Sequence, residues 1–212
     1  MCNCVYNRLK SVRSGIMLNI IQPMTISEFW EFAQLPENRD KRWELINGMP
    51  IEKGRDGDMA PSSKMNSVIA VKIARFLDEY AEKHHLGYVS GADGGYRVGD
   101  NVFQPDAGYI SKARADGLVG GVLENAPDLA VEVVSSYDKE IYVFEKARSY
   151  LLADTTMVWL IFPENRTVYV CTLASEHRLM VDRYERHMTL SGGDILPDFS
   201  LQIARIFPDE SE

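Results

Sequence analysis

A carboxylate in the middle of an apolar run is the first chemically suggestive feature of this sequence. The stretch "PDLAVEVVSS", residues 127–136, is typical of a buried strand, yet Glu132 stands among Val131, Val133 and Val134. A charged group in such a strand is costly unless a cation or several hydrogen-bond donors compensate it. The sequence therefore predicts that a partner for Glu132 comes from elsewhere in the fold.

Other charged residues occur in segments that a fold could bring close to Glu132. Asp106 lies in the apolar stretch "QPDAGYI", Glu44 lies on an expected hairpin, and Lys146 lies on the helical segment that follows Glu132. Carboxylates on adjacent strands can share one divalent cation, and Mg²⁺ prefers such oxygen ligands. A nearby lysine can stabilise developing phosphoryl charge or orient a water molecule. These residue types together are those of a metal-assisted hydrolytic site.

Each of these residues also has an ordinary structural explanation. A strand glutamate such as Glu132 often faces solvent at a sheet edge, and Glu44 can be a plain hairpin residue. Asp106 and Asp128 each follow a proline, where an aspartate commonly caps a turn. Lys146 can be a solvated helix lysine. Taken singly, none of the five specifies chemistry.

The hydrophobic pattern predicts elements that would position these residues. The pair Asn47-Gly48 between two short apolar runs indicates a hairpin over residues 42–52. Apolar residues three and four apart predict an amphipathic helix over 64–84. We also expect helices at 25–35 and 138–152, strands at 87–90, 94–98, 102–111, 127–135, 156–163, 167–173 and 177–185, and a closing turn with a short helix or strand at 190–207. This order predicts an α/β (α+β) fold with a mixed central sheet flanked by helices.

The helix expected at 138–152 carries two stripes of side chains. The stripe assigned to the core consists of Ile141, Phe144 and Leu151. The second stripe, offset from the first, consists of Lys139, Tyr142, Lys146 and Tyr150. The second stripe would bring Lys146 toward the end of the strand that carries Glu132.

Composition fits one globular domain and weighs against several kinds of partner. The 212 residues are 45% hydrophobic and 25% charged. A net charge of −8 argues against a strong nonspecific DNA clamp, because duplex affinity comes largely from neutralising phosphates. It does not suit an anionic membrane surface either, and no apolar run approaches the ~18 residues of a membrane span.

Cysteine usage and the N-terminal stretch bear on location and domain limits. The three cysteines, Cys2, Cys4 and Cys171, suggest no disulfide framework, so we expect a reducing, cytoplasmic setting. Residues 1–23 combine basic residues with a short apolar stretch but offer no small-residue cleavage site. We expect them to be a poorly ordered extension, with residues 24–212 forming a single domain.

From about residue 24 onward the chain resembles the Uma2 family, restriction-endonuclease-like proteins of the PD-(D/E)XK nuclease superfamily. The segments that carry the resemblance occur in the family's order: "MTISEFWEF", "LPENRDKRWELINGMPIE", "MAPSSKMNSVIAVKIARFL", "FQPDAGYIS", "NAPDLAVEVVSS", "EKARSYLLADTTMVWLIFPENRTVYV" and "LSGGDILPDFSLQIARIF". The resemblance implies a PD-(D/E)XK nuclease-like domain over residues 24–212.

The resemblance assigns roles position by position. Asp106 matches the first acid of the nuclease pattern and Glu132 matches the second. Val134 stands where the pattern usually has its lysine, and Lys146 matches a lysine that the family supplies from the following helix. Glu44 matches a recurring acid on the first hairpin. The long, flexible lysine stem makes this relocation feasible.

The resemblance also implies a metal site and marks one departure. Asp106, Glu132 and the backbone carbonyl of Val133 would hold Mg²⁺ or Mn²⁺, with Lys146 positioning or activating the attacking water. The family's long helix often begins with a histidine, whereas this sequence has Met65-Asn66 there. A role for a helix histidine is therefore not expected.

Two functional hypotheses and one structural alternative follow. The first is a metal-dependent endonuclease that hydrolyses phosphodiester bonds in DNA and acts as a homodimer. The second is a nuclease-like fold that binds nucleic acid or a protein partner without cutting. The acidic charge favours the second, as does the absence of a recognisable element for reading bases. The third is an α/β domain whose acids are scattered on its surface, and the set of three acids with Lys146 argues against it.

Overall fold

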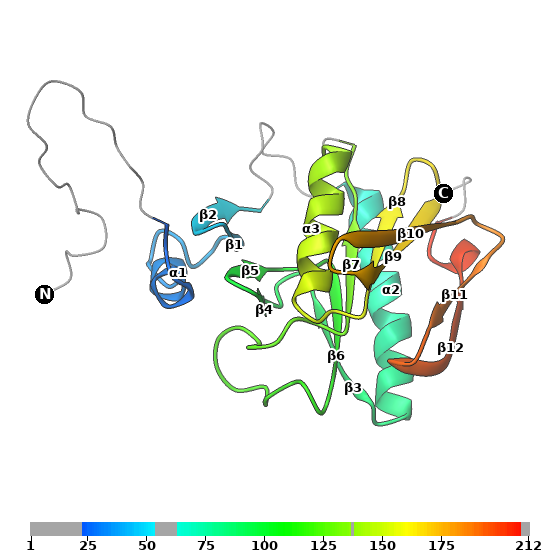
Figure 1. The fold of residues 1–212 in the computed structure, drawn as a ribbon, viewed down its shortest axis with the longest axis horizontal. Coiled ribbons are helices and arrows are strands. Elements are labelled where there is room, and N and C mark those ends of the chain that lie inside the picture. The colour runs from blue at the N-terminus through cyan, green and yellow to red at the C-terminus, as the bar shows by residue number, and fades with distance from the viewer. Residues whose placement is uncertain (1–22, 54–62, 137, 209–212) are drawn as a thin grey trace, which may run out of the picture.

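The computed structural model describes residues 23–53, 63–136 and 138–208, so the extension expected at 1–23 lies almost entirely outside the described residues (Figure 1). The helices are α1 (Ile26–Ala33), α2 (Lys64–Lys83), α3 (Glu140–Leu152) and the short 3₁₀ helix η1 (Ile203–Arg205). The strands are β1 (Trp43–Ile46), β2 (Met49–Glu52), β3 (Gly87–Gly91), β4 (Tyr96–Val98), β5 (Asn101–Phe103), β6 (Ala107–Ser111), β7 (Leu129–Val133), β8 (Met157–Phe162), β9 (Thr167–Ser175), β10 (Arg178–Tyr184), β11 (Thr189–Gly192) and β12 (Leu196–Gln202).

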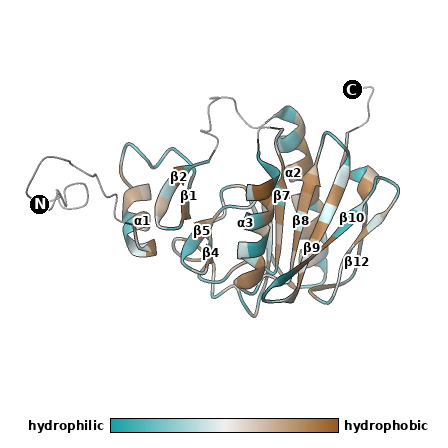
Figure 2. Ribbon diagram, turned by 45° about the horizontal axis from the view of Figure 1, so that its top comes forward, coloured by the Kyte–Doolittle hydropathy of each residue, from teal (hydrophilic) through white to brown (hydrophobic). Residues whose placement is uncertain are grey.

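A six-stranded mixed sheet forms the centre of the molecule. Its strand order is β10-β9-β8-β7-β6-β3, in which β7 and β8 run parallel and the other neighbours run antiparallel. Helix α3 is the connection between the two parallel strands. Figure 2 shows the hydrophobic colouring of β7 and β8, whose residues are buried on both faces. The expected mixed α/β architecture is therefore confirmed.

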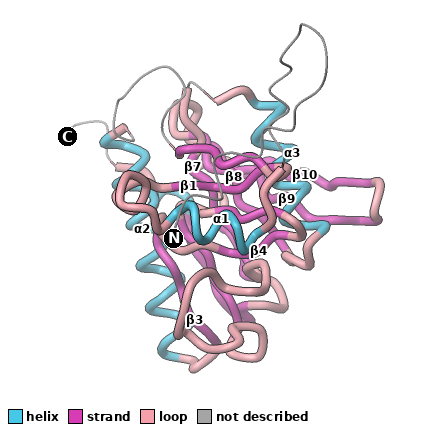
Figure 3. Tube along the Cα trace, turned by 90° about the vertical axis from the view of Figure 1, so that its left-hand side faces the viewer, coloured by secondary structure: helices cyan, strands magenta, loops and turns pink. Residues whose placement is uncertain are grey.

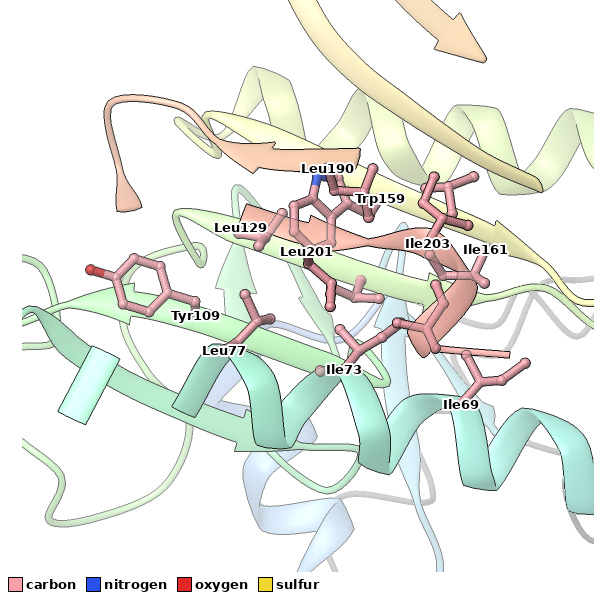
Figure 4. Close-up of a cluster of buried hydrophobic side chains, with 14 of the residues drawn as sticks. Ile69, Ile73, Leu77, Tyr109, Leu129, Trp159, Ile161, Leu190, Leu201 and Ile203 are labelled. Atoms are coloured by element: carbon pink, nitrogen blue, oxygen red, sulfur yellow. The ribbon is translucent and has the colours of Figure 1, made fainter. Parts of the chain in front are cut away.

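One face of this sheet is covered by α2 and by the hairpin of β11 and β12. Ile69, Ile73 and Leu77 recur at steps of four along α2 and are fully buried. They pack with Val131 and Trp159, which point to the same face from β7 and β8. Figure 4 shows α2 lying against the sheet with Leu190, Leu201 and Ile203 completing this core. Figure 3 shows the length of α2 beside the strands.

The opposite face is covered by α3 and by a small second sheet of order β2-β1-β5-β4 (Figure 1). Ala130 of β7 and Leu160 of β8 point to this face and pack against Ala147 and Leu151 of α3. Because side chains alternate along a strand, Glu132 shares this face with Ala130. The polar residues of β7 and α3 are thereby directed toward each other.

Helix α1 covers the outer face of the small sheet. Its first turn is closed by a capping box in which Thr25 and Glu28 satisfy each other's backbone N–H groups. Phe29 and Phe32 of α1 pack with Leu45 of β1. Alternation along β1 then turns Glu44 away from α1 and toward the interior between the two sheets.

The hairpin of β1 and β2 forms at the expected pair. Asn47 and Gly48 have φ of 51° and 75°, the left-handed values that a two-residue turn of this kind requires. The register pairs Glu44 with Ile51. Ser63 caps α2 by accepting a hydrogen bond from the Asn66 backbone N–H.

Two expectations about elements are wrong. The strand expected at 102–111 is two strands in different sheets, because Pro105 lacks an N–H and restricts the residue before it. Ile141, assigned to the core stripe, is 63% exposed, and α3 buries Ala147, Tyr150 and Leu151 instead. The buried face of α3 is rotated toward Tyr150 because it must contact both the sheet and Phe103 of β5.

No helix within residues 23–53, 63–136 and 138–208 combines the length and the apolar character that a membrane crossing requires.

Candidate active site

The two acids of the expected nuclease pattern come together where β6 begins and β7 ends. The register between these strands ends at the pair Ala107 and Val131, so Asp106 directly precedes the ladder on one strand and Glu132 directly follows it on the other. Hydrogen bonds hold Asp106 against the end of β7: its N–H donates to the Val131 carbonyl at 2.9 Å, and the Val133 N–H donates to its Oδ2 at 2.8 Å. The negative charge of Asp106 is close enough to act on Glu132, where it helps to raise the pKa of that carboxyl.

Lys146 reaches this site from α3 and holds two carboxylates. Its Nζ lies 2.8 Å from Glu132 Oε1 and 2.8 Å from Glu44 Oε1. It also lies 5.4 Å from the centre of the Phe103 ring, within the range of a cation–π contact. Tyr150, one turn further along α3, donates its hydroxyl to Glu132 Oε1 at 3.0 Å. Two donors from one helix therefore converge on a single oxygen of Glu132.

Glu44 is fixed from the other side by the chain between β5 and β6. Its Oε1 accepts a hydrogen bond from the Gln104 backbone N–H at 2.8 Å as well as from Lys146. The carboxylate is only 8% exposed. Glu44 thus links the small sheet to α3.

Burial and neighbouring charges shift the pKa values of Glu132, Glu44 and Lys146 in different directions. Burial raises the pKa of Glu132 above its ordinary value, against the opposing attraction of Lys146 and Lys53. Burial also acts to raise the pKa of Glu44, but Lys146, Lys53 and the Gln104 N–H outweigh it, so that pKa is lowered. Burial opposes the charge of Lys146, yet Glu132 and Glu44 together raise its pKa. The two acids therefore favour the charged form of Lys146.

Tyr150 is the fourth ionisable group of the cluster. Burial raises the pKa of its phenol well above the ordinary value, and the charge of Glu132 adds to that rise. This shift favours the protonated hydroxyl, which donates to the Glu132 carboxylate.

A second lysine, which sequence reasoning missed, lies in the same site. Lys53 follows β2, and its Nζ donates to the Gln104 carbonyl and lies 3.2 Å from Asp106 Oδ1. A signal for it existed in the hairpin: the two-residue turn sets a register that places Lys53 two residues beyond Ile51, on the same face as Glu44. The site thus holds three carboxylates and two ammonium groups.

The oxygen atoms fit the divalent ion that the resemblance implies. Two carboxylates of adjacent strands converge, and Glu132 Oε2 has no hydrogen-bond donor among the described residues. The carbonyls of Val133 and Val134 accept only long contacts of 3.4 Å from the Asn66 side chain. No cluster of three or more histidine, cysteine or acidic side chains suited to a metal ion occurs within the described ranges. The donor set is therefore an acid pair with carbonyl oxygen, the kind that leaves places for water on a hard cation.

The remaining sequence candidates are not part of this site. Asp128 lies at the other end of β7, where its carboxylate accepts from Arg114 Nη1 and from the Ser111 N–H, both at 2.6 Å. In the stripe expected on the helix, Lys146 and Tyr150 point into the site, but Tyr142 is 66% exposed and carries Lys139 over its ring. The stripe diverges because residues eight apart on a helix share a face less closely than residues four apart.

Comparison with solved structures identifies one similar fold. A crystal structure from Anabaena variabilis, described as "a putative nuclease belonging to DUF820", superposes with a TM-score of 0.72 and 21% sequence identity. The match covers 87% of this chain and 98% of that one. At this identity the likeness shows that the two chains share a fold. No curated protein matches the sequence significantly.

Comparison with family models covers most of the chain. The model that matches is Uma2, described as "Putative restriction endonuclease", and it spans residues 29–204. This range contains both sheets, α2, α3 and every residue of the site described above. The match agrees with the resemblance seen in the sequence segments, and this chain belongs to the Uma2 family.

Proposed function

We propose that this protein is a metal-dependent endonuclease that hydrolyses phosphodiester bonds in DNA. The observation that carries the proposal is the pair Asp106 and Glu132, brought together at the adjoining ends of β6 and β7, with the Lys146 ammonium 2.8 Å from Glu132. Family membership and the fold support a nuclease-like activity. The metal and the DNA substrate are the parts that this proposal adds.

The metal would be held by Asp106, Glu132 and the Val133 carbonyl, with Mg²⁺ or Mn²⁺ as the ion. When bound, such an ion polarises a phosphoryl oxygen and lowers the pKa of a bound water. The residues of the chain supply the rest. Lys146 and Tyr150 fix the orientation of Glu132 by donating to Oε1, and Oε2 would remain available to the ion.

Lys146 has a narrower role here than the sequence suggested. Its ammonium already satisfies Glu132 and Glu44 at 2.8 Å each. Two of its three N–H donors are thereby used by carboxylates. We therefore assign Lys146 the tasks of keeping both acids charged and holding Glu132 in place.

The proposal is tested by incubating plasmid and single-stranded DNA with the protein in Mg²⁺, Mn²⁺ or EDTA. Cleavage in Mg²⁺ or Mn²⁺ only, abolished by Glu132→Gln and by Asp106→Asn, is the expected result. Glu145→Gln is the matched control, because Glu145 is an exposed acid on α3 outside the cluster. Wild-type protein that cleaves equally in EDTA, or that does not cleave at all, contradicts the proposal.

A second candidate is a nuclease-like module that binds nucleic acid or protein without cutting. One observation favours it: Lys53 and Lys146 contact all three acids, so the cluster is largely neutralised without any metal. The net charge of −8 points the same way. Metal-independent DNA binding by a protein that cleaves nothing is the outcome that this candidate predicts.

A further inference from the structure

We propose that Lys53, and not Lys146, is the ammonium group that contacts the phosphate of the nucleic acid. This inference rests on the proposed function and sharpens it, because it separates the lysine that holds the acids from the lysine that meets the substrate. The separation follows from how the two ammonium groups are bonded.

Exposure does not distinguish the two lysines. The side chains of Lys53 and Lys146 are 20% and 19% exposed. Their partners do differ in depth: Asp106 is 20% exposed, whereas Glu44 and Glu132 are 8% and 12% exposed. The pair of Lys53 and Asp106 therefore lies nearer the surface than the group held by Lys146.

The acceptors of the two ammonium groups distinguish Lys53 from Lys146. An ammonium group has three N–H donors. In Lys146 two donors are used by full negative charges at 2.8 Å, and the ammonium lies over the Phe103 ring. In Lys53 one donor faces a carboxylate at 3.2 Å and one faces the neutral Gln104 carbonyl. The third donor of each lysine has no hydrogen-bond acceptor among the described residues, so the two lysines differ in the charge of the acceptors that they hold.

An incoming phosphate can attract a lysine only if the acids that this lysine leaves can bear the loss of its charge. Withdrawing Lys146 from its partners would leave two acids with little exposure and no cation, which is strongly unfavourable. Withdrawing Lys53 from Asp106 would leave a carboxylate that still accepts the Val133 N–H and is the most exposed of the three. Lys53 can thus turn to a phosphate oxygen at small cost, and beside Asp106 it lies where the scissile phosphate must come.

The test measures how DNA binding by the full chain depends on salt. A fluorescent short duplex is titrated in EDTA by anisotropy between about 50 and 200 mM salt, the range over which phosphate contacts change affinity steeply. The variants are Lys53→Met, Lys53→Gln and Lys53→Arg. Lys112→Met is the matched control, because Lys112 is exposed, follows the far end of β6 and removes the same charge.

Loss of one phosphate contact should lower the slope of log Kd against log salt by about 0.9 for duplex DNA. We expect this for Lys53→Met and Lys53→Gln, while Lys53→Arg and Lys112→Met keep the wild-type slope. Lys53→Gln retains a donor for Asp106 and serves if the methionine variant does not fold. An unchanged slope in the folded Lys53 variants, or an equal loss in Lys112→Met, overturns the proposal for Lys53 and leaves the endonuclease proposal standing. Wild-type protein that neither binds nor cleaves DNA overturns both.

Discussion

The two ends of strand β7 each carry a buried acid, but they handle its charge differently. At the start of the strand, Asp128 has one cation, Arg114, and a backbone donor from Ser111, both at 2.6 Å. At the end of the strand, Glu132 belongs to a group of three carboxylates that shares two lysines. The first arrangement is closed, with one acid, one base and both oxygens satisfied. The second keeps a formal surplus of negative charge and an oxygen of Glu132 without a donor.

The balance of charge at the two ends of β7 distinguishes a structural ion pair from a candidate chemical site. Burial of an acid is common to both ends and is therefore uninformative by itself. A surplus of carboxylates at one edge of a sheet is destabilising in isolation, and a divalent ion would relieve it. The surplus, and not the burial, is the reason for proposing the Glu132 end as the functional one.

The largest effect on stability is expected at the Asp128 end of β7. Asp128→Ala leaves Arg114 and the Ser111 N–H without their acceptor, which should lower the free energy of unfolding by about 3 kcal/mol. Urea unfolding followed by circular dichroism measures this. Binding of Mn²⁺ by the folded variant should be unchanged.

The control for that variant is Glu124→Ala, which removes an exposed partner of Arg97 at 3.4 Å in the same part of the molecule. It should cost less than about 1 kcal/mol. If Asp128→Ala were as mild as this control, or if it abolished ion binding, the two ends of β7 would not differ in the way described.

At the Glu132 end of β7, Lys146→Met should lower stability more than any other single change. It leaves Glu44 and Glu132 without their common cation, and we expect a loss of about 2–3 kcal/mol in metal-free buffer. Millimolar Mg²⁺ should recover part of this loss, because an ion can replace the missing positive charge. Thermal unfolding with and without Mg²⁺ measures both effects.

The double variant Lys146→Met with Glu132→Gln sharpens this prediction. Removing both charges should cost less than the sum of the two single changes, since one of the two unpaired acids is then absent. Additive costs would indicate that Lys146 and Glu132 are not coupled in the folded protein.

The smallest effect is expected from Tyr150→Phe. Loss of the hydroxyl bond to Glu132 should cost about 1–2 kcal/mol at neutral pH, with the aromatic contact to Phe103 kept. Because the pKa of Tyr150 is raised in the folded state, the unfolded chain loses this proton first as pH rises beyond about 10. The wild type must therefore lose stability there more steeply than the variant.

Unfolding curves of both proteins between pH 8 and pH 11 measure this difference, in the range that brackets the ordinary tyrosine pKa of about 10. The gap in stability between wild type and variant should shrink as pH rises. A gap that stays constant would show that Tyr150 ionises alike in the folded and unfolded states.

The sequence predicted those parts of the fold that local patterns determine. The regular spacing of Ile69, Ile73 and Leu77 determined α2, and the pair Asn47-Gly48 determined the first hairpin. Both depend on contacts within a few residues. The division of the expected 102–111 strand was signalled by Pro105, but assignment of its halves to two sheets depends on distant partners.

The candidate site was predictable where a residue carries an improbable charge. Glu132 in an apolar strand is such a residue; Asp106, Glu44 and Lys146 were candidates by residue type, and the family resemblance supplied their roles. Lys53 did not stand out in this way, because a lysine at the end of a hairpin is ordinary by itself. Its contact with Asp106 depends on how the small sheet packs against the large one, which no local pattern in the sequence determines.

Calorimetric titration of the metal-free protein with Mn²⁺ and Mg²⁺ tests the central claim most directly. We expect binding at millimolar concentrations or below by the wild type and by folded Asp128→Ala. We expect none by Asp106→Asn, whose amide keeps an acceptor for the Val133 N–H but lacks the charge. Absence of binding by the wild type, or equal binding by Asp106→Asn, would contradict the claim that the Glu132 end of β7 is a metal-dependent nuclease site.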